Sequence, residues 1–286
     1  MEHRHPQHYL SLWLLVLLCA GCSQPAPVHP LPVATLRPTL ALAPPPTPPS
    51  LAPTSLENSD SDWHDLDHGI SLRHLRIVQG ETSSKFVIVR IDPAGVRFQV
   101  GYAPNAPQGL AAWRSAQNAL VVVNGGFFET DNRSSALVIS GGQAAGESYQ
   151  GRGGMFAIDS SGGVALRYLG EQPYDPAEPL REAIQGWPML IKSGGRLAYT
   201  SNDGDRARRS VIALDRAGRV LIIVCTTSSM TLSELAQWLS TSDLAIDAAL
   251  NLDGGSSTGL DLQIGTQQER VDAFVPLPLV LLALPT

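Results

Sequence analysis

The sequence predicts an α+β fold: a single domain with a mixed, largely antiparallel sheet and a few flanking helices, preceded by a disordered N-terminal segment. Three observations predict it. Short apolar runs alternate with glycine turns, and 25 of the 26 glycines follow residue 62. Only two segments carry the periodicity of a helix. Of the 22 prolines, 11 lie between Pro25 and Pro53, so the chain before the domain has a different composition.

The first 22 residues have the pattern of an export signal. Residues 9–20 read YLSLWLLVLLCA, which is too short for a membrane span of about 20 apolar residues but typical of a signal-peptide apolar region. Cys19-Ala20-Gly21-Cys22 follows and resembles a bacterial lipoprotein cleavage box. We therefore predict a signal peptide over 1–22 and an exported protein anchored to a membrane by a lipid on Cys22. The alternative is an ordinary signal peptide and a secreted or periplasmic protein, because Cys19 stands where an aliphatic residue is usual.

Residues 23–62 are predicted to be a proline-rich disordered linker. Proline stiffens such a segment toward an extended form of about 3.1 Å per residue, so its expected role is a stalk. The remaining residues, 63–286, hold 18 Lys and Arg against 22 Asp and Glu. This segment is long enough to bury one full core. Its acidic balance argues against a nucleic-acid partner, whose binding surface would be basic.

The strands of the domain are predicted from apolar runs that flank turn residues. Each pair of runs is separated by a short segment containing glycine, which is typical of a hairpin. The three predicted hairpins are Lys85–Ile91 with Val96–Tyr102, Met155–Asp159 with Val164–Leu169, and Val211–Asp215 with Val220–Thr226.

Two segments are predicted to be helices, and each leads into a similar motif. Pro107–Asn118 places Leu110 and Trp113 on one side, and Thr231–Ser240 opens with a capping-box pattern that includes Glu234. An apolar run then ends in Asn or Asp followed by two glycines, as Asn124-Gly125-Gly126 and as Asp253-Gly254-Gly255. Such a pattern puts an acceptor at the rim of a sheet where a ligand can approach, or it is simply a tight strand end.

Several common catalytic patterns are missing from the sequence. It contains no GxSxG, Walker, HExxH or paired CxxC motif, and only three histidines follow residue 63. Cys225 lies in the apolar run VLIIVCT, where a buried, inert thiol is expected. The arginines Arg206, Arg208 and Arg209 precede Ser210 and could hold a phosphate bidentately. Their alternative role is in surface ion pairs of a solvated loop.

An ordered set of motifs resembles the phosphodiester glycosidase family from about Leu66 to the C-terminus. The motifs are NGGFF at 124–128, ALVISGG at 136–142, AIQGWPMLIKSGG at 183–195, RRSVIALDRAGR at 208–219, TLSELAQWL at 231–239 and AALNLDGGSST at 248–258. The resemblance implies hydrolysis of a sugar linked through its anomeric carbon to a phosphodiester, with release of free sugar and a phosphomonoester. Residue by residue, it covers Asn124, Gly125, Gly126, Arg209, Ser210, Asp253, Gly254 and Gly255.

The chemistry of that reaction suggests roles for these residues. A carboxylate near the anomeric carbon stabilises positive charge on the sugar, and arginine stabilises negative charge on the leaving phosphate. We expect Asp253 to act as nucleophile or base and Arg209 to bind the phosphate, helped by Arg206 or Arg208. Asn124 is expected to bind sugar or phosphate oxygens.

Further residues and partners complete the expectation. Glu129 and Asp131 are second candidates for acid–base work. Glu234 is expected to cap its helix, and Trp187 is either a core aromatic or a ring that stacks on a sugar. No cofactor is expected, and a divalent cation is left open. The expected partners are a sugar-phosphate or envelope glycan and a membrane. The alternative functions are a non-catalytic glycan-binding surface lipoprotein and a phosphodiesterase that cuts the P–O bond.

Overall fold

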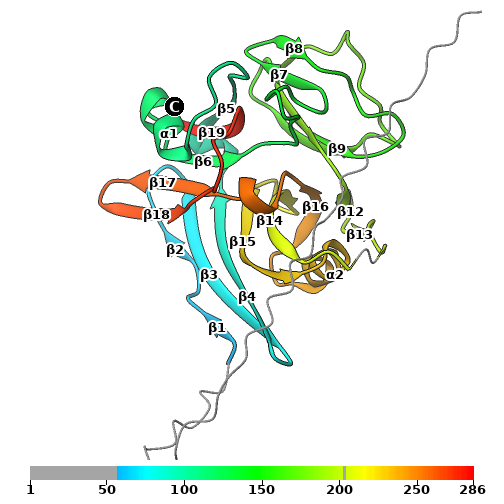
Figure 1. The fold of residues 1–286 in the computed structure, drawn as a ribbon. Helices are drawn as coiled ribbons and strands as arrows, with labels where there is room; N and C mark the ends of the chain where they lie inside the picture. Colours follow the sequence, from blue (N-terminus) through cyan, green and yellow to red (C-terminus); the bar gives the residue numbers. More distant parts are fainter. Residues whose placement is uncertain (1–56, 202–203) are drawn as a thin grey trace, which may run out of the picture. The chain divides into compact units, whose positions relative to one another are not determined.

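Antiparallel sheets make up the part of the chain that the computed structural model describes, residues 57–201 and 204–286 (Figure 1). The predicted signal peptide, Cys22 and nearly all of the predicted linker lie outside these residues. All strand pairs recorded within the described residues are antiparallel, with three sheets in total. The α+β, largely antiparallel fold is therefore confirmed.

The largest sheet has nine strands in the order β1-β3-β4-β15-β14-β16-β12-β13, with β2 paired to β3. Its strands are β1 (Ser59–Asp60), β2 (His64–Asp65), β3 (Ile70–Gln79), β4 (Thr82–Ile91), β12 (Met189–Lys192), β13 (Arg196–Leu197), β14 (Ala207–Asp215), β15 (Val220–Met230) and β16 (Ile246–Asn251). The central strands are rich in Val, Ile and Leu because both faces of the sheet are covered, and two separate apolar clusters pack on them.

Two five-stranded sheets complete the domain. One has the order β18-β17-β6-β19-β5 and the other β10-β9-β11-β7-β8. Their strands are β5 (Val96–Tyr102), β6 (Val121–Asn124), β7 (Val138–Ser140), β8 (Gln143–Ala145), β9 (Gly154–Asp159), β10 (Val164–Tyr168), β11 (Leu180–Gly186), β17 (Leu260–Ile264), β18 (Gln267–Val271) and β19 (Leu279–Pro285). The main core contains residues of all three sheets, which holds their facing sides together.

Two of the three predicted hairpins are confirmed and one is wrong. Strands β9 and β10 pair, as do β14 and β15. Strand β4 instead pairs with β3 and β15, while β5 joins β19 in another sheet. The turn between them is a short 3-10 helix, η1 (Pro93–Gly95), which Asp92 caps. Both edges of β4 are already occupied, so this turn carries the chain from one sheet to the next instead of closing a hairpin.

Both predicted helices are present. Helix α1 (Leu110–Gln117) buries Leu110 and Trp113. Helix α2 (Leu232–Thr241) is capped by Thr231, with the complete capping box predicted for Glu234. Among residues 57–201 and 204–286, no helix has the length and apolar character needed to cross a bilayer.

Candidate functional site

Asn124 forms hydrogen bonds that connect its own glycine turn with Ser210 and with the Asp253 loop. It is fully buried at the end of β6. Its Nδ2 donates to the carbonyl oxygens of Asp253 (2.7 Å) and Gly125 (3.3 Å), and its Oδ1 accepts from Ser210 Oγ (2.6 Å) and the Gly259 amide (3.1 Å). An asparagine side chain has two donors and two acceptor positions, and all are used here. We therefore correct the expected contact with substrate oxygens: Asn124 positions the site.

Asp253 follows β16 and lies beside the first glycine pair. Its amide donates to the Gly125 carbonyl at 3.1 Å, and its own Oδ1 accepts from the Gly254 amide at 2.8 Å. Burial raises the pKa of the Asp253 carboxyl, while hydrogen bonds from Ser257 and Gly254 act in the opposite direction. A carboxylate with a raised pKa is a stronger proton acceptor than one in water. The site therefore holds a partly desolvated carboxyl whose orientation is set by its neighbours.

The glycines of both motifs let their loops lie close to the backbone of neighbouring strands. A Cβ on Gly126 would lie 2.3 Å from the carbonyl oxygen of Gln185, and one on Gly254 would lie 2.9 Å from that of Arg208. Neither distance is compatible with a side chain, and the atoms met are backbone. These positions therefore bring β11 and β14 against the two loops. The short 3-10 helix η2 (Gly255–Ser257) follows directly.

Arg209 lies beside the Asp253 loop. The arginine is only 7% exposed, and its Nη1 lies 3.8 Å from the position of a Cβ on Gly254. Its Nη2 donates to the Asp205 carbonyl at 2.7 Å and pairs with the Asp205 carboxylate at 3.2 Å. Its Nε is buried and has no hydrogen-bond partner among the described residues. A buried donor without a partner is costly, which suits a group that receives a ligand.

Arg208 is buried in a different environment. Its Nη2 donates to the Asp272 carbonyl at 2.9 Å, and its guanidinium stacks over the Phe274 ring at 4.4 Å. Burial lowers the pKa of Arg208. Its Nη1 has no partner among the described residues. Arg208 therefore contacts the segment that follows β18, whereas Arg209 contacts the loop before β14.

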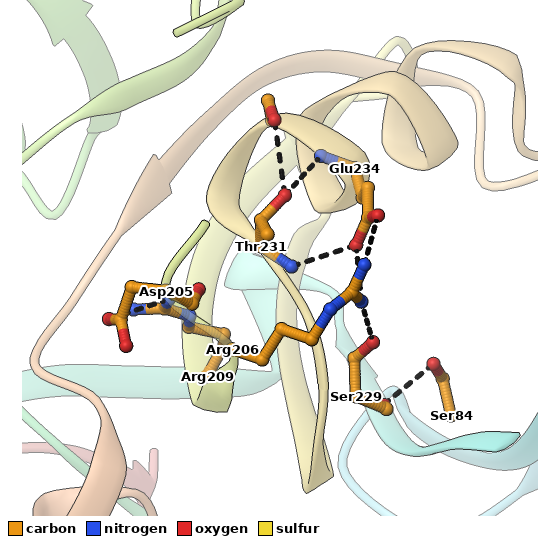
Figure 2. Close-up of polar contacts among 8 residues, drawn as sticks. Ser84, Asp205, Arg206, Arg209, Ser229, Thr231 and Glu234 are labelled. Atoms are coloured by element: carbon orange, nitrogen blue, oxygen red, sulfur yellow. Dashed lines mark hydrogen bonds and ion pairs between the residues drawn. The ribbon is translucent and has the colours of Figure 1, made fainter. Parts of the chain in front are cut away.

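Arg206 extends toward helix α2, as Figure 2 shows. It forms two hydrogen bonds with the carboxylate of Glu234, at 2.7 and 2.6 Å, and a third with the Ser229 carbonyl. The Arg206 side chain lowers the pKa of the Glu234 carboxyl. Glu234 also accepts from the Thr231 amide, so it caps the helix as predicted. The expectation that Arg206 helps to bind phosphate is corrected, because its guanidinium is engaged at the helix start.

Glu129 lies outside the cluster of Asn124, Arg209 and Asp253. It is exposed and lines a hollow of about 450 Å³ together with Arg133 and Glu147. Asp131 pairs with Arg133 at 2.7 Å, which lowers the pKa of the Asp131 carboxyl. Neither carboxylate has a hydrogen bond or ion pair with the Asp253 loop in the described residues.

Asn251 is a buried polar residue close to the candidate site that the motifs did not single out. It is buried at the end of β16, two residues before Asp253, and its Nδ2 donates to the Trp187 carbonyl at 2.9 Å. Its Oδ1 is buried without a partner among the described residues. The available signal was a second polar residue inside the apolar run that leads to Asp253. Cys225, in contrast, is buried as predicted, and burial raises the pKa of its thiol.

The sequence model of the phosphodiester glycosidase family matches residues 117–277, more than half of the chain, and spans Asn124, Arg209 and Asp253. The chain belongs to the phosphodiester glycosidase family. No curated protein sequence matches it significantly. The family membership places the cluster described above inside the conserved family domain and confirms the resemblance predicted from the motifs.

Solved structures share the fold. The catalytic domain of zebrafish N-acetylglucosamine-1-phosphodiester alpha-N-acetylglucosaminidase, auto-inhibited by its pro-peptide, superposes with a TM-score of 0.61 at 19% identity, covering 80% of this chain and 88% of that chain. A hypothetical protein from Synechocystis superposes with a TM-score of 0.54 at 18% identity. The match covers 76% of this chain and 62% of that chain. A protein from Burkholderia pseudomallei that is named as a putative exported protein superposes with a TM-score of 0.52 at 13% identity. The match covers 71% of this chain and 74% of that chain.

Proposed function

We propose that this protein hydrolyses the bond between the anomeric carbon of a sugar and the oxygen of a phosphodiester. The products are the free sugar and a phosphomonoester, and water is the only co-reactant. The observation that carries the proposal is that two charged groups lie at Gly254, within the segment that matches the family: the Asp253 carboxyl accepts from the Gly254 amide, and Arg209 Nη1 lies 3.8 Å from the position of a Cβ on Gly254.

The two charged groups fit the two charges that develop in this reaction. Positive charge grows on the sugar ring as the C–O bond breaks, and negative charge grows on the leaving phosphate. The Asp253 carboxylate, with its raised pKa, either attacks the anomeric carbon or accepts a proton from the attacking water. The phosphomonoester is already a good leaving group, so this mechanism needs little help from a general acid.

In this proposal Arg209 binds the leaving phosphate. Its Nε, which has no hydrogen-bond partner within residues 57–201 and 204–286, offers a donor. Its guanidinium also forms an ion pair with Asp205, whose side chain is 68% exposed. An exposed carboxylate gives up little free energy when another anion takes its place. A phosphodiester oxygen can therefore join or replace Asp205 on the guanidinium, in the bidentate geometry that arginine favours.

Comparing Arg209→Gln with Arg206→Gln tests this assignment. We expect Arg209→Gln to lower kcat/KM by about 100-fold, since one stabilised oxyanion contact in a dry site is worth this much. Arg206→Gln is the matched control: it removes a half-exposed ion pair with Glu234 and is expected to cost no more than about 1 kcal/mol of stability with kcat/KM unchanged. Steady-state kinetics and urea denaturation measure both. Equal losses of kcat/KM in the two variants would contradict the role of Arg209.

Hydrolysis in oxygen-18 water tests the proposed reaction itself. Cleavage of the C–O bond puts the label in the sugar, and mass spectrometry of both products reads it. Label in the phosphomonoester would show that the P–O bond is cut and would replace the proposal with a phosphodiesterase. No turnover of any sugar-1-phosphodiester would leave the non-catalytic glycan-binding alternative.

The N-terminal motifs support a location for this activity. The signal-like segment and the cleavage box at Cys22 lead us to place the enzyme outside the cytoplasm, anchored by a lipid, with an envelope glycan or sugar-phosphate as substrate. We expect the full chain to partition into the detergent phase, and Cys22→Ala to move it to the aqueous phase. Phase separation in Triton X-114 followed by immunoblotting measures this. Unchanged partitioning would contradict the lipid anchor.

A further inference from the structure

An aromatic hollow lies beside the two glycine loops. It has a volume of about 290 Å³ and is lined by Phe127, Ser135, Tyr149, Arg152 and Trp187. This combination of aromatic faces with a hydroxyl and a guanidinium is typical of small-molecule sites, which are mostly apolar with a few polar groups. The volume is near the lower end for such sites, so it fits one small ring better than an extended chain.

Hydrogen bonds tie two walls of the hollow directly to the Asp253 segment. The Trp187 carbonyl accepts from Asn251 at 2.9 Å. On the other wall, Phe127 comes two residues after Gly125, whose carbonyl accepts from the Asp253 amide at 3.1 Å. Both strand-end connections therefore lead to the end of β16. A ring bound in the hollow would lie next to the loop that carries the candidate catalytic carboxyl.

The third wall is held by a buried glutamine. Gln185 Oε1 accepts from the Tyr149 amide at 2.9 Å, and its Nε2 donates to Ser148 Oγ at 2.8 Å. Gln185 is 1% exposed, so the loop that carries Tyr149 is anchored to β11. The Arg152 guanidinium lies 5.3 Å from the centre of the Tyr149 ring. The hydrogen bonds of Gln185 therefore fix the position of Tyr149 in the wall of the hollow.

Trp187 is exposed although its neighbours are buried. Trp187 is 39% exposed, while Gly186 and Pro188 on either side are buried. The Tyr199 ring packs edge-on against it, with ring centres 5.9 Å apart. An indole that stays partly in water gives up part of the free energy of burying it.

We propose that this hollow is the sugar subsite, with the pyranose ring stacked on Trp187. The C–H groups of a pyranose present an apolar face to the indole, and its hydroxyls face the Arg152 guanidinium and the Ser135 hydroxyl. The anomeric carbon then points toward the loop of Asp253. This assignment rests on the proposed function for the nature of the ligand, but the binding of the sugar is separate from its hydrolysis.

Titration with simple glycosides tests the subsite. The probes are the methyl α-glycosides of glucose, mannose, galactose and N-acetylglucosamine, which carry no phosphate, and saturation-transfer NMR with the full chain reads their binding. We expect at least one probe to bind and Trp187→Ala to weaken it about tenfold or more. Trp187→Phe retains an aromatic face and is expected to lose much less. Trp63→Phe, at a partly buried tryptophan that packs on the other core cluster, is the matched control and leaves binding unchanged.

The outcomes separate this subsite from the proposed function. Binding that Trp187→Ala abolishes, with no hydrolysis of sugar-1-phosphodiesters, would overturn the proposed function and keep the subsite. Hydrolysis with a KM that Trp187→Ala does not change would keep the function and overturn the subsite. The absence of binding by all four glycosides up to about 100 mM, a free energy weaker than about −1.4 kcal/mol, would also overturn it.

Discussion

Asp253→Asn is expected to lower kcat by about 10³-fold, within the range measured for loss of a catalytic acid–base group. The amide keeps the size of the carboxylate, and its oxygen can still accept from the Gly254 amide. The variant therefore loses the charge and the basicity while its local structure is retained. Steady-state kinetics on a sugar-1-phosphodiester measures the loss. Retention of full turnover would remove Asp253 from the catalytic role.

The same variant is expected to raise the melting temperature at neutral pH. Burial raises the pKa of Asp253 in the folded state above its unfolded value. The protonated group therefore stabilises the fold below the unfolded pKa, and that contribution is lost as the pH rises through the folded pKa. Asparagine stays neutral throughout, so its advantage exists at pH 7 and vanishes at about pH 3. Calorimetry at both pH values measures it.

Asp131, an exposed carboxylate whose pKa is shifted in the opposite direction, provides a control. Arg133 lowers the pKa of Asp131, so Asp131→Asn is expected to give no gain in melting temperature at pH 7. A lower melting temperature for Asp253→Asn at pH 7 would contradict the desolvation argument. It would mean that the hydrogen bonds from Gly254 and Ser257 outweigh burial, and that the carboxylate is stabilised in the folded state.

Asn124→Ala is expected to cost about 3–4 kcal/mol of unfolding free energy. It removes the hydrogen bonds to Asp253, Gly125, Ser210 and Gly259 and leaves buried donors and acceptors without partners. Ser210→Ala removes only one of these bonds and is expected to cost about 1 kcal/mol. Urea denaturation of both variants measures the difference.

The activity of the Asn124 variant separates positioning from direct contact. If Asn124 acts by holding the loops, the loss of activity follows the loss of stability and is partly recovered at low temperature, where more protein is folded. An Asn124→Ala protein as stable as the parent but inactive would contradict the positioning role. It would return the side chain to the substrate contact that the sequence had suggested.

Local patterns in the sequence were sufficient for both helices and for two of the three predicted hairpins. The capping box of α2 and the buried face of α1 depend on residues within one or two turns, so they were predictable from spacing. The β9–β10 and β14–β15 hairpins are also local. The prediction of a β4–β5 hairpin was wrong because the same turn residues can also connect two different sheets. Whether β4 and β5 pair with each other depends on strands far away in the chain, here β15 and β19.

The site shows the same division. The amino-acid sequence by itself determined the family and the two glycine motifs, because residue types in a fixed order along the chain carry both. Only the tertiary structure decided that Asn124 hydrogen-bonds the loops, that Arg206 binds Glu234 at the start of helix α2, and that Trp187 is partly exposed. Hydrogen-bond capacity and burial depend on neighbours brought together by folding, and no spacing along the chain records them.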